Sequence, residues 1–319
     1  MKSSATIPIL SMPSVKGYFA RMHVYLKEMF PLGGHCAIAL LAALGIAGFS
    51  ATVQRVHFAS TPILVLSAGW NIFAMLLILR LMDELKDQDI DRQLFPNRPL
   101  PSGRVFESDI RGSLSAMTVL YLATNLWSPL IAVSAALVLM YGVLMYKRFF
   151  APMLLKKSLP ITLLTHTPII PLIWLQAFIT VAQLSSVSVQ AMKWRQIALF
   201  VAMSWMVMLG WELSRKIHSR EEENEYVTYS QILGRPGAVA AACAAQTAAM
   251  GICIYFYYSF ALGIPYLLVA GLGWVLCCWA YVRFLLRPSS QTSKFKPYVS
   301  IFAFTILLAQ VYGFVLARP

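Results

Sequence analysis

The acidic side chains of this chain are few and gathered in two short stretches. Of the 13 Asp and Glu residues, seven lie between Asp83 and Asp109, five lie between Glu212 and Glu225, and Glu28 stands alone. Neighbouring carboxylates repel one another unless a cation holds them, and Mg²⁺ takes such oxygen ligands together with substrate phosphates. The spacing therefore indicates two places where metal or phosphate chemistry could occur.

The first acidic stretch, residues 83–91, reads Asp-Glu-Leu-Lys-Asp-Gln-Asp-Ile-Asp and continues an apolar run. On a continuous helix, Glu84, Asp87 and Asp91 lie within about 60° of one another, because each residue turns the helix by about 100°. Acids at a helix C-terminus are unfavourable without a compensating role. We therefore expect a metal site formed by these three acids and Asp83, with a solvated acidic helix end as the alternative.

A proline-rich loop follows directly, at residues 96–104, with the sequence PNRPLPSGR. Its prolines restrict the backbone, and Gly103 can adopt positive φ. Arg98 and Arg104 can donate to phosphate oxygens, singly or in bidentate fashion. By itself the loop is a connector, but it places anion-binding groups next to the acids.

Residues 83–103 together resemble the first signature of the UbiA superfamily of intramembrane prenyltransferases. The acids have the i, i+3 and i+7 spacing of that signature, and Asp-Arg and Asn-Arg-Pro-Leu-x-Ser-Gly follow them as in the family. The usual signature begins Asn-Asp, where this chain has Asp83-Glu84. The resemblance implies nine transmembrane helices, an isoprenoid diphosphate substrate and Mg²⁺ as cofactor.

A Lys-Arg pair closes the fourth predicted membrane span. Tyr141 and Tyr146-Lys147-Arg148 resemble the Tyr-x(n)-Lys-Arg element of the family, whose Lys and Arg grip the diphosphate. Alone, such a pair is more typical of positive-inside anchoring. Beside an acidic metal site, a departing diphosphate needs cationic donors. We expect Lys147 to be catalytic, together with Asp87 and Asp91, and Lys147, Arg148 and Arg98 to bind the diphosphate.

The second acidic stretch resembles the family's second signature by its place and by the ending Thr-Tyr-Ser-Gln-Ile-Leu-Gly at 228–234. The family commonly has two Asp at i and i+4, whereas here Glu212 is followed at i+4 by Lys216. Protonated lysine binds phosphate but cannot ligate Mg²⁺. We expect Glu212 to ligate metal and Arg215 and Lys216 to bind diphosphate. The glutamates at 221–223 are most simply a solvated helix face, so a second metal is left open.

The composition sets the class of protein that must position these groups. The chain has 319 residues, of which 59% are hydrophobic and 12% are charged, with mean hydropathy +0.67. Soluble domains are about 25% charged, so a pair of soluble domains is excluded, as are disorder and a disulfide scaffold. The net charge of +13 then indicates loops facing anionic lipid, not a nucleic-acid partner.

We therefore predict an all-α polytopic membrane protein, since a bilayer core needs about 20 apolar helical residues per crossing. A segment 1–31 precedes a transmembrane domain 32–319, and turns at 125–129 and 259–265 divide two long apolar runs. The nine predicted spans are 33–53, 62–82, 112–127, 129–146, 159–182, 196–213, 237–257, 262–282 and 298–317.

The distribution of basic residues predicts the orientation. One set of loops, with the N-terminal segment, holds most of the 26 Lys and Arg, whereas the opposite set holds Arg55, Lys193, Arg195 and Arg318. This bias places the N-terminus and both acidic stretches in the cytoplasm. Apolar residues at helical spacing within 15–29 predict an interfacial amphipathic helix, and no cleaved signal peptide is expected.

The resemblance implies transfer of a prenyl group to a lipophilic, commonly aromatic, acceptor in a membrane that excludes water. A terpene cyclase and a prenyl-phosphate transferase on the same scaffold are alternatives. A transporter is less favoured, because it predicts carboxylates in mid-span. His166 lies within a predicted span, where it could be functional or could bond a neighbouring helix or a backbone carbonyl, and we assign it no role. Prenyl length, acceptor and oligomeric state stay open.

Overall fold

The computed structural model describes residues 15–54, 61–223 and 227–316, which form helices and no strands. The predicted all-α class is confirmed. The first part of the predicted segment 1–31, together with Arg55, Glu225 and Arg318, lies outside the described residues. The division at residue 31 stays a prediction.

Thirteen α-helices and three short helical turns follow one another along the described chain. They are α1 (Val15–Met29), α2 (Leu32–Gln54), α3 (Thr61–Lys86), α4 (Gln88–Leu94), α5 (Glu107–Ala123), α6 (Pro129–Tyr146), η2 (Arg148–Phe150), α7 (Pro152–Lys157), α8 (Leu159–His166), α9 (Ile169–Leu184), η3 (Val189–Ala191), α10 (Trp194–Ser214), α11 (Tyr229–Ser259), α12 (Ile264–Leu286), α13 (Lys296–Val311) and η4 (Tyr312–Leu316).

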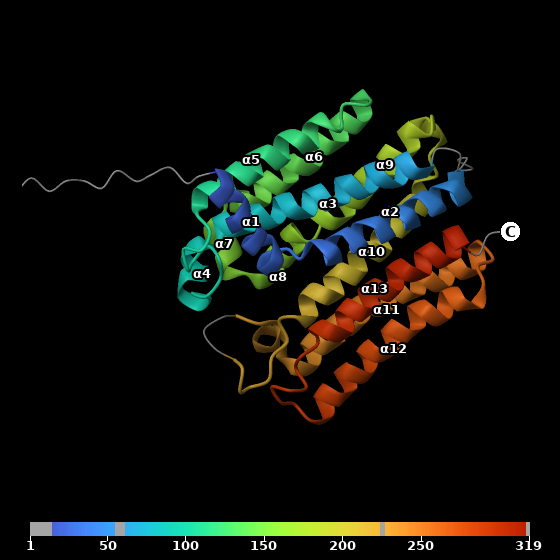
Figure 1. Cartoon of the computed structure of the whole chain (residues 1–319). Coiled ribbons are helices and arrows are strands. Elements are labelled where there is room, and N and C mark those ends of the chain that lie inside the picture. The colour runs from blue at the N-terminus through green and yellow to red at the C-terminus, as the bar shows by residue number, and fades with distance from the viewer. Residues whose placement is uncertain (1–14, 55–60, 224–226, 317–319) are drawn as a thin grey trace, which may run out of the picture.

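The long helices form one elongated bundle whose axes run roughly along a common direction (Figure 1). Helix α3 packs against α2, α5 and α9, while α10 to α13 pack against one another. Helix α2 also contacts α13 and so joins the two sets of helices. The short helices α4, α7 and α8 gather at one end of the bundle (Figure 1).

Eight helical segments are long and apolar enough to cross a membrane, which agrees with an integral multi-pass membrane protein. The one predicted span without such a segment is 112–127, which corresponds to α5 with 17 residues. The count of nine and the cytoplasmic N-terminus stay predictions. Both predicted turns are confirmed, because α5 and α6 are separated at 124–128 and α11 and α12 at 260–263. The span predicted at 159–182 consists of two helices, α8 and α9.

The prediction of one continuous helix over residues 83–91 is wrong. Helix α3 ends at Lys86 and α4 begins at Gln88, because Asp87 has φ −105° and ψ 14°. Backbone hydrogen bonds from Asp87 to Asp83 (3.0 Å) and from Asp91 to Asp87 (2.9 Å) bridge this residue. The helix direction is therefore interrupted locally, and the acids do not share one simple helical face.

The predicted helix within 15–29 exists as α1, and it packs on the protein. Tyr25 is fully buried and Met22 nearly so, whereas Phe19 is 66% exposed. Arg21 donates two hydrogen bonds to Asp109 of α5, at 2.6 and 2.8 Å. Helix α1 is therefore held by packing and hydrogen bonds at the end of the bundle where α4 lies.

A buried polar network joins α3, the end of α5 and α9 within the apolar bundle. The Asn71 amide donates to Thr180 Oγ1 at 3.0 Å, and the Asn125 amide donates to Asn71 Oδ1 at 2.8 Å. Gln176 donates to Asn125 Oδ1 at 3.2 Å and accepts from the Tyr121 hydroxyl at 2.7 Å. These bonds fix how the three helices pack, because buried polar groups require partners.

Candidate active site

Two of the predicted metal ligands, Glu84 and Asp91, lie in a buried ionic group near α1. Glu84 is 2% exposed and pairs with Arg80 one turn earlier, and the Tyr25 hydroxyl donates to it at 3.4 Å. Asp91 is buried and accepts a hydrogen bond from Arg98 at 2.7 Å. The other Glu84 oxygen, Oε1, is buried without a hydrogen-bond partner among the described residues.

The other two acids of this stretch, Asp83 and Asp87, contact different bases. Lys86 Nζ lies 2.6 Å from Asp83 Oδ1, and Arg148 Nη2 lies 3.3 Å from Asp87 Oδ1. Burial raises the pKa of Asp87 above its ordinary value, although Lys86 and Arg148 act in the opposite direction. Among the described residues, no side-chain hydrogen bond or ion pair joins Asp83 or Asp87 to Glu84 or Asp91, although the Asp91 backbone N–H donates to the Asp87 carbonyl at 2.9 Å.

A left-handed turn carries the Lys-Arg pair to the acids. Arg148, Phe149 and Phe150 have φ of 50°, 50° and 55°, a region that costs non-glycine residues about 1–2 kcal/mol each. The turn lets Arg148 donate to the Lys86 carbonyl at 3.2 Å as well as reach Asp87. Strain of this kind persists where the surroundings hold it, often at functional sites.

Lys147 directly precedes this turn, but unlike Arg148 its side chain is exposed and forms no ion pair with the described acids. It is exposed, and its ammonium lies 5.3 Å from the centre of the Tyr146 ring. Tyr141, the other tyrosine of the motif, packs edge-on against Phe149 at 5.6 Å and donates its hydroxyl to the Thr165 carbonyl at 2.9 Å. Tyr141 therefore links the turn to α8.

The second acidic group lies at the end of α10. Arg215 Nη2 donates to Glu212 Oε1 at 2.7 Å, and Lys216 Nζ lies 3.7 Å from the same oxygen. Lys216 is 8% exposed. Both predicted diphosphate-binding residues of this stretch are thus gathered around the predicted metal ligand.

His166, at the end of α8, lies beside the turn that carries Arg148. Its ring is 5.8 Å from the Phe149 ring, and Nδ1 lies 3.0 Å from the Thr162 carbonyl oxygen. The charges of Lys86, Asp83 and Glu212 are all close enough to act on this ring. The ends of α3, α6 and α10 lie at the same end of the bundle (Figure 1). The two acidic stretches, far apart in sequence, therefore border one region.

Of the glutamates that follow α10, Glu222 forms hydrogen bonds between two loops and Glu221 is exposed. Glu222 accepts hydrogen bonds from the Ser219 backbone N–H at 3.1 Å and from the Ser293 hydroxyl. Burial would raise the pKa of Glu222, but the bonds from Ser293 and Ser219 outweigh it and hold that pKa below its usual value. Glu222 thus ties the loop after α10 to the loop before α13, while Glu221 is exposed.

Sequence reasoning missed several partners of the predicted residues. Arg104 of the proline-rich loop forms a bidentate pair with Glu28 of α1, with one contact at 2.9 Å, and also donates to the Asn97 carbonyl at 2.7 Å. The hydrogen bonds from Arg104 lower the pKa of Glu28. Arg80 and Tyr25, which surround Glu84, carried no motif signal. Their roles depend on α1 crossing the end of α3, which no local pattern predicts.

The donor set suits Mg²⁺ in chemical type, because it consists of carboxylate oxygens and includes the unpartnered Glu84 Oε1. Among the residues that the structure describes, no three His, Cys, Asp or Glu side chains converge as a preformed metal cluster. Each predicted ligand instead contacts a basic side chain; the pairs are Asp83–Lys86, Glu84–Arg80, Asp87–Arg148, Asp91–Arg98 and Glu212–Arg215.

A protein family matches the sequence of this chain, and solved structures share its fold. The UbiA prenyltransferase family is matched over residues 39–308. The structure of a digeranylgeranylglyceryl phosphate synthase in membranes is similar at TM-score 0.64 and 18% identity, covering 93% of this chain and 99% of that one. The apo structure of a UbiA homologue from Aeropyrum pernix K1 is similar at TM-score 0.63 and 17% identity, covering 87% and 97%. No curated protein matches the chain.

Proposed function

The chain belongs to the UbiA prenyltransferase family, and we propose that it transfers a prenyl group from an isoprenoid diphosphate to a lipophilic, aromatic acceptor. Family membership and the fold support intramembrane prenyl transfer. The observation that carries the proposal to named residues is the contact of Arg148 with Asp87 at 3.3 Å. It joins an anion-binding cation to a carboxylate at one end of an apolar helical bundle.

The basic residues around the acids bind the diphosphate head. Arg148, Lys147, Arg215 and Lys216 offer N–H donors from the ends of α6 and α10, and Arg98 offers a guanidinium from the proline-rich loop. A diphosphate gains from such donors as the prenyl–oxygen bond breaks, because negative charge accumulates on the departing oxygens. Arginine suits this role, since it meets phosphate oxygens in bidentate fashion.

The acids hold Mg²⁺ together with the diphosphate. The ligands we assign are Asp83, Glu84, Asp87, Asp91 and Glu212. Bound Mg²⁺ supplies Lewis-acid stabilisation of the leaving pyrophosphate. In the structure these carboxylates contact Lys and Arg side chains. Diphosphate oxygens would be alternative partners for those bases, and the released carboxylate oxygens would then be available to hold the metal.

The helical bundle protects the allylic cation that follows ionisation. Water would convert that cation into a prenol, so the reacting carbon must lie in a dry environment. The site lies at the end of helices with long apolar runs, from which a prenyl chain can extend into the bundle. Aromatic rings beside the Lys-Arg turn, such as Tyr141 and Phe149, stabilise positive charge through their π faces. We place the site on the cytoplasmic side, because the loops on that side hold most of the Lys and Arg residues.

Product analysis tests the proposal. Full-length protein in nanodiscs is incubated with prenyl diphosphates of several lengths, with and without Mg²⁺, and with a lipid extract, and products are identified by mass spectrometry. We expect Mg²⁺-dependent pyrophosphate release and a prenylated lipophilic product. A cyclic hydrocarbon formed without acceptor supports the cyclase alternative instead, and a prenyl-phosphate adduct supports the phosphotransfer alternative. The absence of any turnover with all donors contradicts the proposal.

A further inference from the structure

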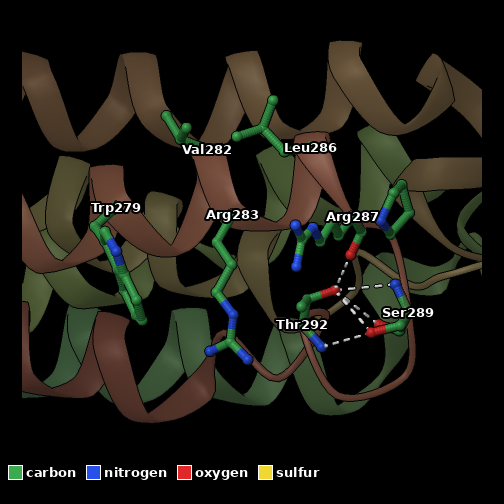
Figure 2. Close-up of a pocket in the computed structure, with 8 residues that line it drawn as sticks. Trp279, Val282, Arg283, Leu286, Arg287, Ser289 and Thr292 are labelled. Atoms are coloured by element: carbon green, nitrogen blue, oxygen red, sulfur yellow. Dashed lines mark hydrogen bonds between the residues drawn. The ribbon is translucent and has the colours of Figure 1, made fainter.

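The outer side of α12 forms an open pocket outside the acidic site. The pocket has a volume of about 590 Å³ and is lined by the last turns of α12 and the loop that follows. Figure 2 shows the side chains of Arg283 and Arg287 between Trp279 on one side and Ser289 and Thr292 on the other. None of these residues belongs to the proposed prenyl-transfer site.

The residues that line the pocket include two arginines and no acid. Residues 283–297 contain four basic residues, Arg283, Arg287, Lys294 and Lys296, and no Asp or Glu. In the described parts of the chain, neither arginine pairs with an acid. Arg283 lies in the last turn of α12 and Arg287 directly follows the helix, so two like charges line one pocket and repel one another. An anion held between them would relieve that repulsion.

The pocket also has an apolar wall on a helix that is suited to crossing the membrane. Trp279, Val282 and Leu286 are 51%, 55% and 76% exposed, although all three are large apolar side chains. The Trp279 ring packs against that of Tyr298 on α13 at 5.7 Å. Trp and Tyr gather at the headgroup level of membranes, so this pair places the pocket at that level.

A hydrogen-bonded turn at residues 287–292 forms one side of the pocket, next to the arginines. The Thr292 hydroxyl donates to the Arg287 carbonyl at 2.8 Å and accepts from the Ser289 backbone N–H at 2.9 Å. Arg283 lies 5.4 Å from the centre of the Trp279 ring. The guanidinium groups are thus positioned between a fixed turn and an aromatic ring.

We propose that this pocket binds the headgroup phosphate of an anionic phospholipid. Arg283 and Arg287 bind the phosphate, and the acyl chains lie along Val282 and Leu286. A free phosphate ion would use only the arginines, whereas a lipid uses both the basic and the apolar parts of the pocket. Basic clusters immediately beside a transmembrane helix attract anionic lipid by about 1 kcal/mol per Lys or Arg.

Native mass spectrometry of the full-length protein in detergent tests the proposal, with dioleoylphosphatidylglycerol and dioleoylphosphatidylcholine as probes. We expect the protein to bind phosphatidylglycerol more tightly. The double variant R283Q/R287Q should bind it roughly 30-fold more weakly, and each single variant about fivefold, on the attraction per basic residue. The matched control is K294Q/K296Q, which removes the same charge from two exposed residues that do not line the pocket, Lys294 in the same loop and Lys296 at the start of α13.

The outcomes are distinct. An equal loss in the arginine and lysine pairs indicates unspecific surface charge and overturns the proposal, as does unchanged binding in R283Q/R287Q. Full displacement of the lipid by inorganic phosphate at matched concentration also overturns it, because the apolar wall then contributes nothing. Leu286→Asn provides a second variant: weaker phosphatidylglycerol binding supports the lipid assignment, and unchanged binding contradicts it. If the arginine double variant does not fold, the two single variants decide the test.

Discussion

The guanidinium of Arg148 contacts the carboxylate of Asp87 at 3.3 Å, although 61 residues separate the two in sequence. Three successive residues of positive φ make this contact possible, because they turn the chain sharply after α6. One member belongs to the group proposed to grip diphosphate, and the other to the group proposed to hold the metal. The contact is therefore the point at which the two functions meet.

Arg148→Gln should raise the KM for the prenyl diphosphate about 10-fold to 100-fold, because a hydrogen bond to a charged group contributes about 1.5–3 kcal/mol. Steady-state pyrophosphate release with varied prenyl diphosphate measures this effect. Arg111→Gln is the matched control, because Arg111 is an exposed arginine outside the proposed site that pairs with Glu107 on its own helix. A KM in Arg148→Gln equal to that of the control contradicts a direct role in binding.

Lys147→Ala should weaken binding of the prenyl diphosphate more than binding of the acceptor. Lys147 is exposed beside Arg148 and forms no ion pair with the acids of the described chain, so its ammonium is available to an incoming anion. Separate titrations of donor and acceptor give the two apparent affinities. An equal loss for both substrates would show that Lys147 anchors the helix end at the membrane surface.

Asn71→Ala should lower the stability of the helical bundle without selectively weakening the affinity for the prenyl diphosphate. The substitution removes bonds to Thr180 and Asn125, and interhelical hydrogen bonds in membrane proteins contribute about 0.6 kcal/mol on average. A double-mutant cycle with Thr180→Val, followed by thermal unfolding in detergent, measures the coupling. Strictly additive effects of the two substitutions would contradict a functioning Asn71–Thr180 bond.

The ion pair between Arg21 of α1 and Asp109 of α5 should weaken at low pH. The hydrogen bonds from Arg21 lower the pKa of Asp109, so this carboxylate stabilises the fold above its unfolded pKa of about 3.9. That stabilisation is lost as the pH falls through the lower, folded pKa. The difference in Tm between wild type and Arg21→Gln should be constant above about pH 5 and shrink below about pH 4. A difference independent of pH in that range would contradict the ion pair.

The class of fold followed from sequence because it depends on composition and apolar run length. The turns near Pro129 and Pro265 were also predictable, since proline interrupts helices locally. The kink at Asp87 was not, because residues 83–91 contain neither proline nor glycine. Its consequence is that Glu84 and Asp91 have partners different from those of Asp83 and Asp87.

The residue types of the candidate site were predictable, but their partners were not. Lys216 at the position of an expected acid was visible in sequence, whereas its burial and its distance of 3.7 Å from Glu212 required the structure. Glu28 looked isolated in sequence, yet it pairs with Arg104 because α1 crosses the proline-rich loop. Such contacts depend on tertiary packing, which no local spacing encodes.

The most direct test of the account compares three carboxamide substitutions in one acidic stretch. Asp87→Asn and Asp91→Asn remove proposed metal ligands, whereas Asp89→Asn removes a carboxylate whose side chain is 94% exposed. The measurement is Mg²⁺-dependent pyrophosphate release from a prenyl diphosphate by protein shown to be folded in nanodiscs. We expect loss of release in the first two variants and near wild-type release in Asp89→Asn. Full activity in both Asp87→Asn and Asp91→Asn would contradict it.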